Sequence, residues 1–182
     1  SNELFDSFPV HRVTVRDGAL QEIYVTLKED SFAEVLGPPS TPDLEWRLEL
    51  LGVTLAEGSV AEGNLAVEPW LEEVSQALDR GVLLTVDYGD TAAKLYSPHR
   101  RRGTLACFHG HTQTDDPYRR VGAPDMTSHV DFTSLVEAGK TQGLEPLGGG
   151  TQGEFLRNLG LPKITERLSR MGLGQREADA NR

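Results

Sequence analysis

An uninterrupted apolar run, residues 82–86, constrains the fold of this chain more than any other feature. It reads Val-Leu-Leu-Thr-Val and directly follows a segment whose apolar residues recur at helical spacing. That segment begins at Pro69 and ends at Gly81, residue types typical of the first turn and of the end of a helix. A continuous apolar strand after an amphipathic helix is typical of a parallel sheet covered on both faces. The sequence therefore predicts an α/β fold in which residues 82–86 form a buried strand.

Polar residues follow this strand at the point where it is predicted to end. They are Asp87, Tyr88, Gly89 and Asp90. In open α/β sheets, ligands bind just beyond the carboxyl ends of the strands. Gly89 permits a tight turn or a close approach of another backbone segment. We therefore expect Asp87, Tyr88 and Gly89 to line a binding cleft.

The first ten residues have the pattern of a second strand exit. Asn2, Glu3 and Asp6 lie among apolar residues in a run that ends at Pro9. Asn and Asp are also common turn residues, so a purely structural role is the alternative. If this exit neighbours the one at Asp87, the two strand ends define a single cleft.

The region between these exits predicts a surface insertion over about residues 12–62. Val13 and Val15 alternate with polar residues, Asp17-Gly18 suits a two-residue turn, and apolar residues continue from Leu20 to Val25. Thr41-Pro42 then suits the start of a helix that ends near Leu51. We expect one domain spanning residues 1–182 that carries this hairpin and helix.

Residues 97–131 predict a long, irregular and polar loop on the substrate side, because loops of this length in compact domains are often functional. Asp131 is the expected N-cap of the next helix. Farther along we expect a short strand over 144–147, a capping box from Thr151 to Glu154, and helices over 162–168 and 176–182.

The histidines of this loop raise the question of a metal site. His109-Gly110-His111 precedes Asp115 and Asp116, but the spacing departs from that of metallo-hydrolases, in which an Asp stands two residues after the second His. We therefore predict no metal, and expect these side chains to bond to backbone groups. The arginines at 100–102 and 119–120 form basic patches that suit either a solvated loop or a clamp for an acidic partner.

Composition excludes several classes of protein. The formal net charge of −10 disfavours non-specific binding to nucleic acid or anionic membranes. No run approaches the roughly 20 apolar residues of a membrane span. Cys107, the single cysteine, excludes a disulfide framework and is expected to be a small buried apolar residue in a reducing compartment.

Several sequence blocks together resemble one family. Asn-Glu-Leu-Phe-Asp-Ser-Phe-Pro-Val-His (residues 2–11) is similar to a motif of the MidA-type S-adenosylmethionine-dependent methyltransferases. These are related to the mitochondrial arginine methyltransferase that assists assembly of respiratory complex I. Further similar blocks occur in the family's order at residues 86–89, 102–105, 116–117, 127–132 and 151–156. The resemblance covers almost the whole chain.

The resemblance implies a fold and a truncation. Residues 2–6 would lie at the end of the fourth strand of a Rossmann-like sheet with helices on both faces. The family's glycine-rich loop and acidic residue, which hold S-adenosylmethionine, precede that block. We therefore expect this chain to be the middle and C-terminal portion of a class I methyltransferase, without the N-terminal cofactor-binding part.

The resemblance also implies roles for the residues at the two strand exits. Asn2, Glu3 and Asp6 are the expected catalytic residues, with Asn2 and Glu3 also close to the cofactor. The Glu3 and Asp6 carboxylates could pair with an arginine guanidinium and orient its attacking nitrogen.

Asp87, Tyr88 and Gly89 are the expected substrate-binding residues of the next strand end. His129 and Asp131 would form a second wall or a proton relay, although a structural His–Asp contact is equally compatible with the sequence. Clustered carboxylates repel one another, and sites that receive a cation tolerate this repulsion.

The substrate implied by the resemblance is an arginine side chain of a protein, such as a complex I subunit, with S-adenosylmethionine as cofactor. We expect no nucleic-acid partner and no membrane insertion, and a cytoplasmic location, or the mitochondrial matrix if the source is eukaryotic. The alternative is a non-catalytic interaction or assembly module without the cofactor loop. A glycine-rich loop encoded just upstream of Ser1 would favour the enzyme.

Overall fold

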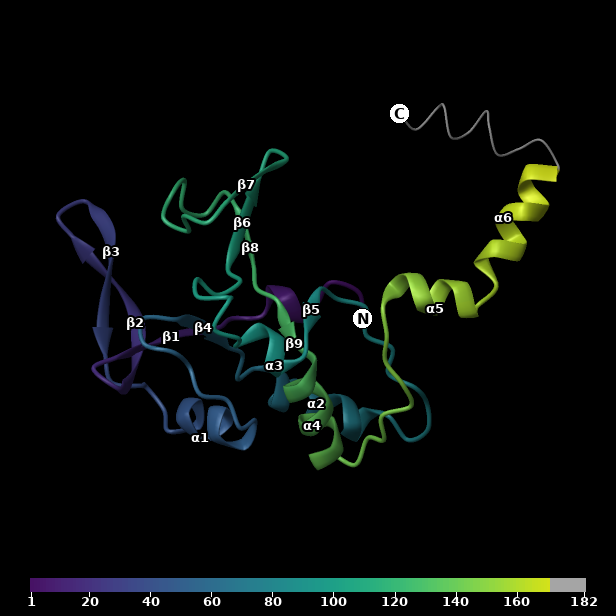
Figure 1. The fold of residues 1–182 in the computed structure, drawn as a ribbon, viewed down its shortest axis with the longest axis horizontal. Helices are drawn as coiled ribbons and strands as arrows, with labels where there is room; N and C mark the ends of the chain where they lie inside the picture. The colour runs from purple at the N-terminus through teal and green to yellow at the C-terminus, as the bar shows by residue number, and fades with distance from the viewer. Residues whose placement is uncertain (171–182) are drawn as a thin grey trace. The chain divides into compact units, whose positions relative to one another are not determined.

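The computed structural model describes residues 1–170 of the chain, and these form a mixed α/β fold (Figure 1). The chain divides into two compact units, Ser1–Glu145 and Pro146–Arg182. Each unit is described by itself. The expectation of a single domain stays a prediction.

A four-stranded antiparallel sheet with the order β3-β2-β1-β4 dominates the first half of unit 1. Its strands are β1 (His11–Arg16), β2 (Ala19–Lys28), β3 (Ser31–Gly37) and β4 (Val60–Gly63). The predicted hairpin is confirmed: Val15 pairs with Leu20, and Asp17 and Gly18 both adopt positive φ, as a type I′ turn requires. Strands β3 and β4 were not predicted. The β2–β3 turn contains no glycine, and Glu29 adopts the left-handed conformation there (φ 55°).

Helix α1 (Asp43–Leu50) lies within the region predicted as helical, one residue after the expected first helical position. Its Leu44 is buried together with Val13 of β1 and Ala61 of β4. The predicted hairpin and helix therefore share a small core of their own.

A second core joins the start of the chain to two helices. It contains Phe5, Val67, Leu71, Val130 and Ala138. Phe5 belongs to the short 3-10 helix η1 (Phe5–Ser7), while α2 (Val67–Ala77) and α4 (Phe132–Thr141) pack against each other (Figure 1). Helix α2 begins two residues before Pro69, which therefore lies in its first turn, where proline is tolerated.

The prediction of a buried strand over residues 82–86 is wrong. Val82 and Leu84 are exposed, and Val86 alone forms a bridge, parallel to Asn2. The remaining parallel pairing in residues 1–170 consists of β5 (Gly89–Asp90) with β9 (Val130–Asp131) and a bridge between Val60 and Arg102. An apolar run is buried only where other elements cover it, and the described residues leave one face of this run uncovered.

The description of residues 97–131 as irregular is also wrong in part. They contain an antiparallel sheet with the order β7-β6-β8, formed by β6 (Ala106–His109), β7 (Thr112–Thr114) and β8 (Asp125–Thr127). A short helix, α3 (Ala92–Leu95), precedes the segment. The three strands are short and largely exposed, so they carry little hydrophobic alternation.

Unit 2 contains α5 (Gln152–Asn158) and α6 (Leu161–Arg170). The predicted capping box at Thr151 and Glu154 is confirmed, as is the helix after Gly160. Residues 144–147 form no strand, because the segment has no pairing partner among the described residues. The predicted helix over 176–182 lies outside the described residues. None of the described helices has the length and apolar content that crossing a bilayer requires.

Candidate active site

The two predicted strand exits are neighbours. The N–H of Glu3 donates to the Val86 carbonyl at 2.9 Å, and the N–H of Val86 donates to the Ser1 carbonyl at 3.0 Å. Glu3 adopts a left-handed conformation (φ 46°), which is uncommon for a non-glycine residue and turns the chain into η1. The backbone contact confirms that the two ends lie side by side, while the expectation that they define a single cleft stays a prediction.

Asp87 uses its carboxylate to hold this turn. Its Oδ2 accepts hydrogen bonds from the backbone N–H groups of Leu4 (3.1 Å), Phe5 (3.0 Å) and Asp6 (3.4 Å). Its Oδ1 accepts from the N–H of Tyr88 at 2.9 Å. The carboxylate therefore acts as the cap of η1, a structural role for Asp87. Its expected role in substrate binding stays a prediction.

Asp6 is the most unusual acid of the site. It is 3% exposed, and its Oδ1 is buried without a hydrogen-bond partner. Burial raises the pKa of Asp6, and the negative charges of Asp87 and Glu3 raise it further. A buried carboxylate oxygen without a partner is costly unless a donor or cation arrives. Asp6 thus has a buried oxygen that can accept a hydrogen bond or face a cation.

Tyr88 borders the same cluster. Desolvation raises the pKa of its phenol, and the nearby charges of Glu3, Asp6 and Asp87 raise it further. The phenol therefore stays protonated at neutral pH and remains a hydrogen-bond donor. Glu3 and Tyr88 are exposed, so ligands can approach the cluster from their side.

Gly89 is required by a close backbone approach. A Cβ atom at this position would lie 2.0 Å from the carbonyl oxygen of Val130, on the paired strand β9. This confirms the prediction of a close approach at Gly89. The contact joins the Asp87 strand end to the segment that carries His129 and Asp131.

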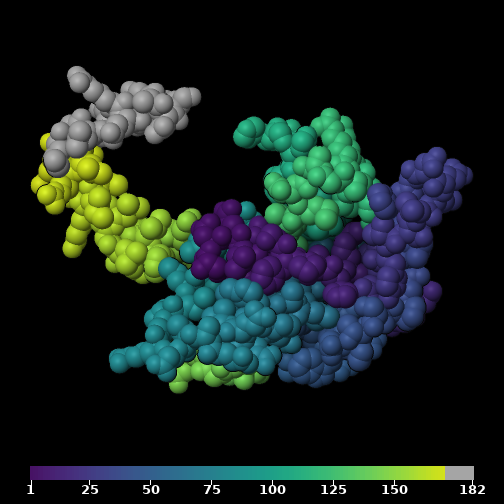
Figure 2. All heavy atoms as spheres, turned by 180° about the vertical axis from the view of Figure 1, so that it is seen from behind, coloured from purple at the N-terminus to yellow at the C-terminus, as the bar shows by residue number. Residues whose placement is uncertain are grey.

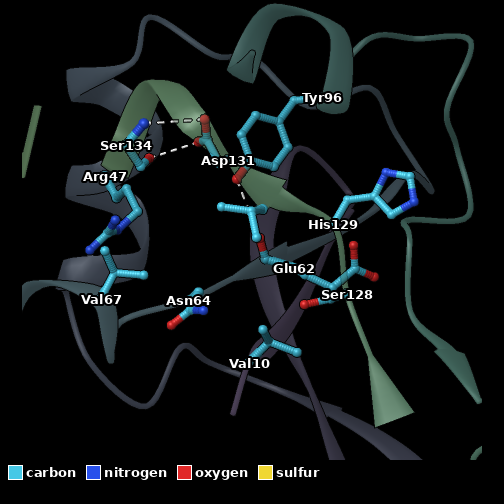
Figure 3. A pocket seen from close by; sticks show the side chains of 11 residues that line it. Val10, Arg47, Glu62, Asn64, Val67, Tyr96, Ser128, His129, Asp131 and Ser134 are labelled. Carbon is cyan, nitrogen blue, oxygen red and sulfur yellow. Dashed lines mark hydrogen bonds between the residues drawn. The ribbon is translucent and has the colours of Figure 1, made fainter. Parts of the chain in front are cut away.

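His129 and Asp131 are engaged separately. The Asp131 carboxylate caps α4, accepting from the N–H groups of Thr133 (2.9 Å) and Ser134 (3.2 Å) and from the Ser134 hydroxyl (2.7 Å). The predicted N-cap is therefore confirmed. Figure 3 shows this carboxylate turned toward Ser134 and the His129 ring turned away from it. The His129 Nδ1 lies 3.3 Å from Arg100, and partial burial and the Arg100 charge lower the pKa of His129.

Three residues beside Asp131 were missed by the sequence analysis: Arg47, Glu62 and Tyr96. They line a space of about 20 Å³ (Figure 3), which is the size of one water molecule. Glu62 accepts from the N–H (2.8 Å) and the hydroxyl (3.0 Å) of Thr104, and Tyr96 donates to the Glu62 carbonyl at 3.3 Å. The buried Arg47 pairs with Glu68 at 3.1 Å. No sequence pattern indicated this network, because Glu62 is a single charged residue in a short strand.

Two of the histidines of the 97–131 segment, His109 and His111, lie in the β6–β7 hairpin together with Cys107. His109 ends β6 and contacts the Ala123 carbonyl at 3.3 Å, while His111 lies in the turn. Cys107 is fully buried, as predicted, and burial raises the pKa of its thiol. Among residues 1–170, no three His, Cys, Asp or Glu side chains are grouped as a metal site requires.

Comparison with known proteins identifies relatives of the whole arrangement. The chain is 29% identical over 168 residues to the protein arginine methyltransferase NDUFAF7 homolog, mitochondrial, of Drosophila melanogaster. That alignment covers 87% of this chain and 36% of the Drosophila protein.

Two crystal structures from Burkholderia thailandensis, described as members of one superfamily, are also similar. One, bound to S-adenosyl-homocysteine, matches with a TM-score of 0.87 at 29% identity, covering 96% of this chain and 45% of that one. The other, a native structure, matches with a TM-score of 0.89 at 29% identity, covering 99% and 48%. The chain therefore spans between about a third and a half of the length of these relatives.

A family match covers most of the chain. Residues 1–149 match the family described as "putative S-adenosyl-L-methionine-dependent methyltransferase". The matched range contains both strand exits, the Asp6 cluster and the β5–β9 contact. On this evidence, the chain belongs to that S-adenosyl-L-methionine-dependent methyltransferase family.

Proposed function

We propose that this chain forms the acceptor-binding part of an S-adenosylmethionine-dependent methyltransferase that modifies an arginine side chain of a protein. The observation that carries the proposal is Asp6, a buried carboxylate whose Oδ1 has no partner and whose neighbours are acidic. The name of the Drosophila relative, a protein arginine methyltransferase, supports arginine as the acceptor.

The acidic cluster suits a guanidinium in charge and shape. A guanidinium is a planar cation that pairs bidentately with carboxylates. Asp6 would hold it from the buried side and Glu3 from the exposed side. The pairing orients one nitrogen and satisfies the free oxygen of Asp6. The protonated Tyr88 hydroxyl borders the same site and can donate a hydrogen bond to it.

The cofactor is the second cation that this cluster suits. S-adenosylmethionine, when bound, supplies the methyl group on a positively charged sulfur. Asn2 and Glu3 are exposed beside the Val86 bridge, so their side chains are free to face it. We propose that the parallel contacts of residues 1–3 with 84–86, and of β5 with β9, belong to a Rossmann-like sheet of the whole enzyme.

His129 and Asp131 contribute differently in this proposal. Asp131 acts through α4, because its carboxylate is committed to the helix N-terminus. His129 is exposed and its lowered pKa keeps it neutral at pH 7, so it can form part of the second wall. We propose the cytoplasm, or the mitochondrial matrix if the source is eukaryotic, as the location, and a respiratory-complex subunit as one class of protein substrate.

The test uses the full-length protein with Glu3→Gln and Asp6→Asn substitutions. Each variant removes one of the negative charges that would pair with the guanidinium, while keeping the shape of the side chain. Methyl transfer to arginine peptides should fall at least about 30-fold in kcat/KM, the effect of about 2 kcal/mol lost from a buried charge pair. Affinity for S-adenosylmethionine in the Asp6 variant, measured by calorimetry, should stay within about threefold.

Asp79→Asn is the matched control, because Asp79 is an exposed acid after α2, outside the cluster. It should leave methyl transfer unchanged. Activity within a few-fold of wild type in both Glu3→Gln and Asp6→Asn would refute the acceptor site. A full-length protein that binds a respiratory subunit without methylating it would favour the non-catalytic assembly module.

A further inference from the structure

A large cleft leads away from Asp6 and has no part in the chemistry described so far. Its volume is about 450 Å³, within the range of ligand pockets. Asp6 and the segment after it line one end, and strands β1–β3 and the region from Pro117 to Ser128 form the walls. Figure 2 shows the β6–β8 region (green) and the β2–β3 ribbon (dark blue) rising side by side beyond the purple N-terminal segment.

Most of the side chains in the walls are apolar, and several are left uncovered. Val25 is 54% exposed, Phe32 43%, Val121 57% and Met126 53%. Exposed apolar residues gathered in one concave surface indicate a binding site rather than ordinary surface. Their position around a hollow next to a buried acid restricts what can bind there.

Contacts between the walls hold the outer part of the cleft together. The ring of Phe32 on β3 stacks on that of Tyr118 at 6.2 Å between centroids, and the Tyr118 hydroxyl donates to Glu34 at 3.0 Å. Glu34 also pairs with Arg12 of β1. The apolar walls are therefore positioned before any ligand arrives, which lowers the cost of binding.

The charges along the cleft favour a cation at the Asp6 end. Glu22 is already paired with His11 at 2.7 Å and with the N–H of Ser40 at 2.6 Å, and Arg12 is paired with Glu34. The Nε of Arg12 has no partner, but its guanidinium is neutralised by that pair. Asp6 is thus the acid that lines the cleft with a buried and unpartnered oxygen.

We propose that this cleft holds the stretch of the substrate protein beside the acceptor arginine and selects a large apolar side chain within a few residues of it. The proposal rests on arginine methylation as the function. The guanidinium would lie at the acidic cluster, and the apolar side chain would pack against Val25, Phe32 and Met126. The enzyme would then recognise a cationic residue with an apolar neighbour, rather than arginine alone.

The experiment uses synthetic peptides with one central arginine and either Phe or Ser at each flanking position, tested on the full-length protein. Both methyl transfer and binding, by fluorescence anisotropy with S-adenosyl-homocysteine present, are measured. At one or more positions, Phe should improve kcat/KM and affinity at least about tenfold over Ser, as expected when a large apolar side chain is buried. Val25→Ser and Met126→Gln should reduce this preference at least about fivefold.

Val35→Ser is the control, because Val35 is similarly exposed (44%) on the same sheet but does not line the cleft. It should keep the full preference. A preference that survives in both cleft variants, or methyl transfer with no apolar preference in wild type, would overturn the cleft proposal and leave arginine methylation intact. Cleft-dependent binding without methyl transfer would support the cleft and refute the proposed function. Self-association of the protein that Val25→Ser weakens would overturn the proposal in favour of a second copy as occupant.

Discussion

Replacing Asp87 should first destabilise the turn at residues 4–6, whose backbone N–H groups its carboxylate binds. Its Oδ2 accepts from the N–H groups of Leu4 and Phe5 at 3.1 and 3.0 Å. Hydrogen bonds to a charged group contribute about 1.5–3 kcal/mol, and loss of a helix cap costs about 1 kcal/mol. Asp87→Asn keeps an acceptor but loses its charge, and relieves repulsion with Asp6. We therefore expect a net cost of about 1 kcal/mol, and about 2 kcal/mol for Asp87→Ala, which removes the acceptor.

Hydrogen exchange at the Phe5 amide measures this cost locally. About 1 kcal/mol corresponds to roughly fivefold faster exchange in Asp87→Asn, and about 2 kcal/mol to roughly 30-fold in Asp87→Ala. Asp90→Asn is the control, because Asp90 accepts from Thr91 and pairs with Lys94 at the surface, away from η1. Unchanged Phe5 exchange combined with lost methyl transfer would refute the structural role and assign the carboxylate to the ligand.

The same substitution should shift the titration of Asp6. Burial and the charge of Asp87 raise the Asp6 pKa above 3.8, so Asp6 contributes stability that is complete below pH 3.8 and is lost as pH rises through its folded pKa. In Asp87→Asn the Asp6 pKa should fall, so this loss should be smaller and should be complete at lower pH. Carboxyl NMR of Asp6 measures it directly, and an Asp6 pKa that rises or stays constant would contradict the proximity of the two acids.

Three further substitutions test separate parts of unit 1. Gly89→Ala should lower the free energy of unfolding, measured in urea, by about 3 kcal/mol, because its Cβ would meet the Val130 carbonyl at 2.0 Å. A loss below about 1 kcal/mol would mean that β5 and β9 are not paired. Asp131→Ala should cost about 1 kcal/mol through loss of the α4 cap, and normal stability would exclude that cap. Burial alone would raise the pKa of Glu22, but hydrogen bonds from His11 and Ser40 lower it to about 2. The stabilising contribution of Glu22 is therefore present above pH 4.5 and is lost as pH falls toward 2. Thermal melts of Glu22→Gln from pH 7 to pH 2 should lack this component, and an acid transition identical to that of wild type would contradict it.

Local elements were predictable because their signals are carried by adjacent residues. Asp17-Gly18 requires a left-handed turn, Asp131 caps the helix that follows it, and Thr151 and Glu154 satisfy each other's backbone groups. The order of family blocks likewise lies in the sequence itself. None of these features depends on a partner that is distant along the chain.

The extent of burial could not be predicted, because it depends on which elements cover a segment. Residues 82–86 are as apolar as a buried strand, yet Val82 and Leu84 are exposed. The strands within residues 106–127 were not predicted, because they are short and exposed and so lack the apolar pattern of a buried strand. They are held by antiparallel pairing with one another.

The candidate site divides in the same way. The sequence by itself determined that acids follow two apolar segments, and that Gly89 allows a close backbone approach. Only the tertiary structure decided that Asp87 holds the η1 backbone while Asp6, buried beside it, keeps a free oxygen. The difference arises because a carboxylate's role depends on which donors reach it. Those donors lie more than eighty positions away in sequence and are brought to Asp87 by the parallel contact between Asn2 and Val86.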